Sequence, residues 1–172
     1  MLEALTEVGR GLFAALFAVA AGSKMRPRAF ADLSASLALY GMTKVLRRLA
    51  ATTLIAAEAT AATVLILGPA SAGLGLAALL LTVFAGGVLV SMRRRLNVRC
   101  ACFGTAGETL SGRHLWRNTT LAALALILAL APAGATPLDL ASRILLTAVG
   151  VILGIATVLH DSVAAAITTR NP

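Results

Sequence analysis

Residues 72–92 read AGLGLAALLLTVFAGGVLVSM, an unbroken apolar stretch that contains no charged side chain. An α-helix needs about 20 consecutive apolar residues to cross the hydrocarbon core of a bilayer. Within that core every backbone N–H and C=O group must find its partner inside the protein, and a helix achieves this within a single segment. The stretch therefore predicts a transmembrane helix.

The composition of the whole chain agrees with this prediction. Hydrophobic residues make up 59% of the 172 residues and charged residues only 13%, whereas soluble domains contain about 25% charged residues. The predicted spans cover residues 5–21, 49–68, 72–92, 116–131 and 144–159. The fourth of these has the shortest apolar core. We therefore predict an all-α fold, an integral membrane bundle of four to five transmembrane helices that forms a single domain over residues 1–172.

The basic residues predict the orientation of this bundle. Most of them fall into two groups between the apolar runs. The first group comprises Lys24, Arg26, Arg28, Lys44, Arg47 and Arg48, and the second Arg93, Arg94, Arg95, Arg99, Arg113 and Arg117. Loops rich in Lys and Arg mark the cytoplasmic side and also attract anionic lipid. Nucleic-acid binding needs a continuous basic surface, so the net charge of +8 indicates the lipid bilayer as the partner.

Three acidic residues, Glu3, Glu7 and Asp139, fall in segments on the opposite side. A secretory signal peptide begins with a positive region, whereas Glu3 and Glu7 precede the first apolar run. We predict a retained helix with the N-terminus outside, and a cytoplasmic cysteine loop and C-terminus. Lys24 is expected to anchor the first helix at the interface. Residues 28–42 carry one apolar stripe, which favours a helix lying in the interface.

Glu58 lies near the middle of the second predicted span. A charged side chain at that depth costs roughly 3 kcal/mol on insertion scales, so an intramembrane carboxylate is a candidate functional residue. The alternative is a structural hydrogen bond or ion pair inside the bundle, with Arg10 as the expected partner.

Two groups of glycines in the predicted spans are expected to pack against neighbouring helices. Gly73, Gly75, Gly86 and Gly87 are expected to let neighbouring helices approach the third span. Gly150 and Gly154 form a G-x-x-x-G pattern in the last span, which is a common helix-packing motif.

The two cysteines, Cys100 and Cys102, lie in the loop predicted over residues 93–115. Arg99 and Arg95 favour thiolate over thiol, and the thiolate is the attacking species in disulfide exchange. A disulfide across one residue is cramped, because disulfides prefer Cα atoms about 5.5 Å apart, and strained disulfides are more oxidising. The pattern therefore favours a redox pair, although two thiolates also suit Cu(I) or Hg(II).

His114 and Trp116 follow in the same part of the chain. His114 could exchange protons with a thiol near neutral pH, while the ordinary alternative is a solvated loop histidine. Trp116, the only tryptophan, is expected to anchor a helix at the interface.

The order of these features resembles the MauE family of methylamine-utilisation membrane proteins, which is related to DoxX. The resemblance is carried by the motifs Ala21-Gly22-Ser23-Lys24, Tyr40-Gly41, Glu58, Cys100-Ala101-Cys102-Phe103-Gly104 and Trp116-Arg117-Asn118. It implies a small helical membrane protein of a disulfide-forming system that works beside a thioredoxin-like partner. On this resemblance Cys100 and Cys102 are the redox pair, and Glu58, Arg117 and Asn118 are supporting positions. A quinone or partner protein would complete the circuit, because the chain has no second cysteine pair.

Three functions therefore remain open. The first is a membrane thiol–disulfide oxidoreductase, or the membrane component of one. The second is a soft-metal binder or transporter with the two thiolates as ligands. The third is a non-catalytic subunit whose helices dock onto a larger membrane complex.

Overall fold

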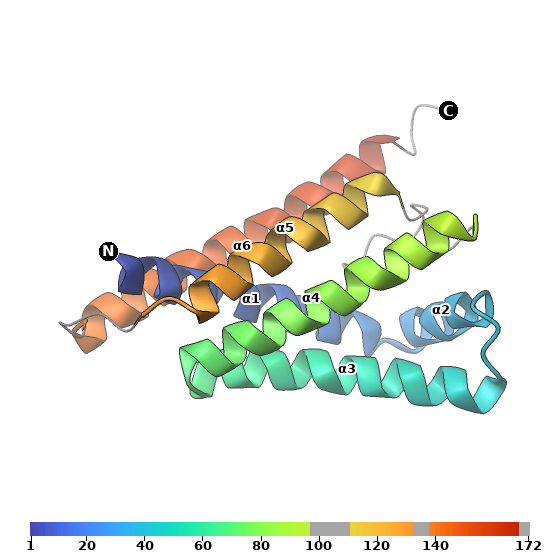
Figure 1. Cartoon of the computed structure of the whole chain (residues 1–172), viewed down its shortest axis with the longest axis horizontal. Helices are drawn as coiled ribbons and strands as arrows, with labels where there is room; N and C mark the ends of the chain where they lie inside the picture. The colour runs from blue at the N-terminus through green and yellow to red at the C-terminus, as the bar shows by residue number, and fades with distance from the viewer. Residues whose placement is uncertain (97–110, 133–137, 169–172) are drawn as a thin grey trace.

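The computed structural model describes residues 1–96, 111–132 and 138–168, with side chains as far as His160. These residues form six helices and no strand, which confirms the all-α prediction (Figure 1). The helices are α1 (Leu2–Lys24), α2 (Pro27–Ala38), α3 (Lys44–Leu67), α4 (Ala70–Arg93), α5 (Gly112–Ala129) and α6 (Leu140–Thr168).

Four of these helices, α1, α3, α4 and α6, are long and apolar enough to cross a membrane. The polar first turns of α5 separate it from this group, yet its 18 residues span about 27 Å at 1.5 Å per residue. The end of α5 meets the starts of α1, α4 and α6 around one pocket, so α5 runs between the same two ends of the bundle as its neighbours. The expected four to five spans are thus confirmed.

The core is built around α1. Phe13, Leu16 and Phe17 of this helix are buried against residues of α3, α4 and α5, among them Leu65 and Leu81. By contrast, the outer surfaces of α3 to α6 remain apolar and exposed. Lipid tails offer no hydrogen-bond partners, so apolar helix surfaces of this kind are suited to contact with them.

Helix α2 is shorter than the expected helix over residues 28–42. It begins with Pro27 at its first position and has no buried residue. The chain turns at Leu39–Gly41, and Gly41 takes a left-handed backbone with φ of +82°. Glycine adopts that conformation without steric cost, which is why the helix ends before the predicted boundary.

Helices α1 and α6 contact each other backbone to backbone. A Cβ atom built on Gly150 would lie 2.0 Å from the Val8 carbonyl oxygen, and one on Gly11 would lie 2.0 Å from that of Thr147. Gly154 is similarly close to Leu12. The G-x-x-x-G motif is therefore confirmed as a packing face, and it holds the last helix against the first.

Three of the four glycines expected to pack in α4 do not do so. A Cβ on Gly73 would approach Leu65 to 2.9 Å, but at Gly75, Gly86 and Gly87 it would meet nothing within 4 Å in the described structure. The expectation was wrong for these three because the helical repeat turns their Cβ positions away from the described neighbouring helices.

Candidate functional site

The predicted redox pair lies outside the described residues. Cys100, Cys102 and the supporting residue Arg99 fall within residues 97–110, which the structure does not describe. Both helices that flank this segment are described, and the last turn of α4 and the first turn of α5 lie at the same end of the bundle (Figure 1). We call this the cysteine end, and the opposite end, which carries Glu7, the Glu7 end.

The chain leaves α4 through a fixed turn. Arg95 has a positive φ of 51°, the Leu96 N–H donates to the Ser91 carbonyl at 2.9 Å, and the Arg95 N–H donates to that of Met92 at 3.1 Å. This left-handed pattern terminates many helices and satisfies their last carbonyl groups. It sets the direction in which the chain enters the cysteine segment.

The chain re-enters the bundle through a helix cap. Ser111 is extended at the start of α5, and its N–H donates to His114 Nδ1 at 3.3 Å. The contact requires an unprotonated Nδ1. The structure thus places His114, the candidate proton exchanger, as a capping residue directly after the cysteine segment.

A buried ion pair lies inside the bundle. Lys24 Nζ, at the end of α1, is 2.8 Å from Glu58 Oε1 and 3.0 Å from Oε2, and both side chains are 1% exposed. The expected pairing of Glu58 with Arg10 was wrong. Arg10 instead donates to the carbonyl groups of Leu65, Ile66 and Gly68 near the end of α3.

The predicted position of Lys24 was wrong. It was expected at the membrane interface, whereas it turns inward and also donates to the Ala20 carbonyl at 3.2 Å. Its three ammonium hydrogens thus have three acceptors. A buried charge is tolerated when it is paired and hydrogen-bonded, and the inward turn of Lys24 provides this for Glu58.

The side chain of Asn118, on α5, is also buried inside the bundle. It is 4% exposed, and its Oδ1 atom has no hydrogen-bond partner among the described residues. Together with Glu58 it lines a cavity of about 10 Å³. The remaining lining residues are Phe13, Leu16, Phe17, Ala20, Leu81 and Phe84.

The structure therefore brings two of the predicted supporting residues, Glu58 and Asn118, into one small cavity. Arg117, the third residue of the resemblance, is half-buried and does not line it. The cavity is far smaller than the 300–1,000 Å³ typical of small-molecule sites, so a quinone ring does not fit into it.

A second polar cluster lies at the Glu7 end. Glu7 accepts from Arg143 Nε at 3.0 Å and from Thr147 Oγ1 at 3.2 Å, and it lies 3.7 Å from Arg10. This cluster ties α1 to α6. The contribution of Arg143 was missed, because nothing in its local sequence indicates that α6 packs beside α1.

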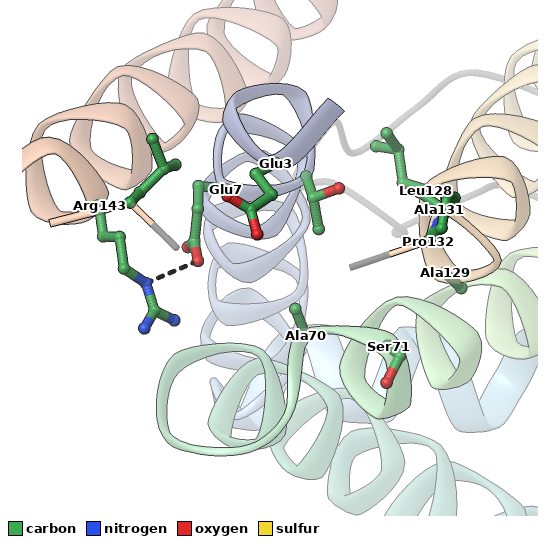
Figure 2. Close-up of a pocket in the computed structure, with 11 residues that line it drawn as sticks. Glu3, Glu7, Ala70, Ser71, Leu128, Ala129, Ala131, Pro132 and Arg143 are labelled. Atoms are coloured by element: carbon green, nitrogen blue, oxygen red, sulfur yellow. Dashed lines mark hydrogen bonds and ion pairs between the residues drawn. The ribbon is translucent and has the colours of Figure 1, made fainter. Parts of the chain in front are cut away.

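Beside this cluster lies a pocket of about 440 Å³ between the starts of α1, α4 and α6 and the end of α5. Figure 2 shows the Arg143 side chain reaching across to Glu7, with Glu3 on the same helix and Ser71 on the far side. Arg143 adds a cation at the end predicted to lie outside.

In the described ranges, no three His, Cys, Asp or Glu side chains lie close enough to hold a metal ion.

Comparison with known proteins identifies the family of this chain. The family described as methylamine utilisation protein MauE matches residues 2–131. The chain belongs to the MauE family. No curated protein and no solved structure matches it.

The match covers α1 to α5 and thus both cavity-lining polar residues and the cysteine segment. Together with the four apolar helices, it makes this MauE protein a multi-pass membrane protein. Helix α6, which packs against α1, lies beyond the matched residues.

Proposed function

We propose that this MauE protein is the membrane component of a thiol–disulfide redox system, with Cys100 and Cys102 as the redox pair. One observation supports the proposal above the others. Lys24, Glu58 and Asn118 belong to three separate motifs of the family resemblance, and they converge inside the bundle. The two helices that flank the cysteine segment, α4 and α5, both contribute residues to the cavity beside Glu58.

The proposed chemistry is an exchange of two electrons. A thiolate of the partner attacks the Cys100–Cys102 disulfide, one cysteine leaves as thiolate, and a mixed disulfide forms. A second partner thiolate then releases the other cysteine, so the partner is oxidised and the pair reduced. The disulfide form of a thioredoxin-like protein, or a quinone, then accepts two electrons and two protons from the reduced pair, which returns to the disulfide. Arg95 and Arg99 stabilise the leaving thiolates.

The test is disulfide exchange by the purified protein in lipid nanodiscs, with glutathione disulfide as the probe. Cys100→Ser and Cys102→Ser should each stop at a mixed disulfide with glutathione and release one glutathione, whereas the reduced wild-type pair should release two, because neither single thiol can close an intramolecular disulfide. Thr52→Ala, which changes an exposed hydroxyl side chain on α3, should retain the wild-type behaviour.

A redox titration in thiol buffers distinguishes the proposal from soft-metal binding. A two-electron midpoint that disappears in both single variants supports it. Wild-type exchange in both variants, or stoichiometric Cu(I) retention without such a midpoint, would overturn it.

We further propose, from the basic groups, that the cysteine end faces the cytoplasm. A membrane-impermeant maleimide should then label Cys100 and Cys102 only in permeabilised cells, after reduction of any disulfide. Labelling in intact cells after reduction would reverse the orientation and would assign the pair to the oxidation of exported proteins.

A further inference from the structure

The cavity between Glu58 and Asn118 combines three features. It has a volume of about 10 Å³, and a cavity of about 10–15 Å³ holds one water molecule. It is lined by Asn118, whose buried carboxamide oxygen has no partner among the described residues. It also borders a buried carboxylate whose charge Lys24 balances.

Two of the residues that line the cavity, Glu58 and Asn118, carry hydrogen-bond acceptors. An ionised carboxylate has about four acceptor positions, and Lys24 occupies one on each oxygen of Glu58. Asn118 Oδ1 accepts as well. The Lys24 ammonium has its acceptors in Glu58 and in the Ala20 carbonyl. A ligand that joins the Glu58 carboxylate to Asn118 Oδ1 must therefore donate two hydrogens.

The charge and size of the cavity restrict the ligand further. Lys24 and Glu58 form a neutral pair, which favours a neutral ligand over a cation. The six other lining residues are apolar at the cavity surface, and three of them are phenylalanines. We propose that the cavity holds one water molecule, which donates one hydrogen to the Glu58 carboxylate and the other to Asn118 Oδ1. This inference is independent of the proposed thiol chemistry.

The bridge explains how a buried asparagine is accommodated in α5. Buried polar groups in proteins are almost always hydrogen-bonded, to the protein or to ordered water. A water molecule here gives Asn118 Oδ1 its hydrogen bond and Glu58 a third one. It thereby links a side chain of α3 to a side chain of α5.

Water-edited solid-state NMR of the protein in phosphatidylcholine vesicles tests this proposal. The chain has three asparagines, Asn97, Asn118 and Asn171, so labelling of asparagine with ¹³C and ¹⁵N gives few signals. The Asn118→Leu variant identifies the Asn118 carboxamide by its loss. We expect polarisation from water to reach this carboxamide within milliseconds although the side chain is only 4% exposed.

A cavity-filling variant provides the matched control. Ala20→Val adds two methyl groups at a lining residue and should abolish the transfer to Asn118. Ala77→Val makes the same change at a fully buried position outside the cavity and should leave the transfer intact.

Each outcome in the wild-type protein decides the proposal. Polarisation that reaches Asn118 only from lipid and methyl protons would mean a dry cavity and would overturn it. A shift of the Asn118 signal when choline replaces sodium would indicate a bound cation and would also overturn it. The Cys100→Ser/Cys102→Ser variant should show the wild-type signal, so failure of the proposed redox function leaves this test unaffected.

Discussion

Removing one member of the buried ion pair, by Lys24→Met or by Glu58→Leu, is expected to cost about 3–5 kcal/mol of stability. Each substitution leaves a single charge in a site where both side chains are 1% exposed. The partner charge then has no counterion and no bulk water to stabilise it. This is one of the two largest effects that we expect from a single substitution.

The double variant Lys24→Met/Glu58→Leu should recover most of that loss. Replacing a whole buried ion pair by apolar residues of similar volume is often neutral or stabilising. Unfolding in mixed detergent and SDS micelles, followed by far-ultraviolet circular dichroism, measures all three variants. A double variant as unstable as the sum of the two single variants would contradict the pairing.

Lys44→Met is the matched control for this series. It is the same substitution at an exposed lysine in the first turn of α3, and exposed substitutions usually change stability by no more than about 0.5 kcal/mol. Equal losses in Lys44→Met and Lys24→Met would show that burial of the pair does not determine the effect.

The second large effect is expected for Gly150→Leu, at about 3 kcal/mol or more. Overpacking a well-packed interior typically costs about 1–3 kcal/mol. Here even the Cβ atom would lie 2.0 Å from the Val8 carbonyl oxygen and 2.8 Å from the Leu12 backbone nitrogen. Backbone atoms cannot rotate away as a side chain can, so α6 must separate from α1.

Gly86→Leu is the control for this substitution. Gly86 is exposed on α4, and a Cβ there meets nothing within 4 Å in the described structure. The same detergent titration should show little change for Gly86→Leu. If both leucine variants unfold at the same SDS fraction as wild type, the close α1–α6 contact is not important for stability.

The comparison of these glycines shows the limit of the sequence pattern. Gly73 and Gly75 lie two residues apart in α4, and of these two only Gly73 has a neighbouring helix within 4 Å of a Cβ built on it in the described structure. Residues two apart on a helix do not face the same direction. Composition therefore indicates that a span has small residues, while only the arrangement of the helices decides which of them permit close approach.

The partner of Glu58 shows the same limit. Both Arg10 and Lys24 lie on α1, separated by 14 positions in the numbering, which corresponds to about 21 Å along a helix. Because α3 runs antiparallel to α1, Glu58 lies beside Lys24 whereas the end of α3 lies beside Arg10. Neither the sequence around Arg10 nor the sequence around Lys24 indicates which of the two residues lies beside Glu58.

The sequence by itself determined that this is an all-helical membrane protein of four to five spans. Hydropathy and segment length are local properties, and the bilayer requires each spanning segment to satisfy its own backbone groups. The family motifs also pointed to Glu58 and Asn118 before their positions were known. The tertiary structure alone decided that Lys24 turns inward, that Glu58 and Asn118 share a cavity, and that Arg143 reaches Glu7. These contacts join residues far apart in the chain, and they depend on which helix faces meet.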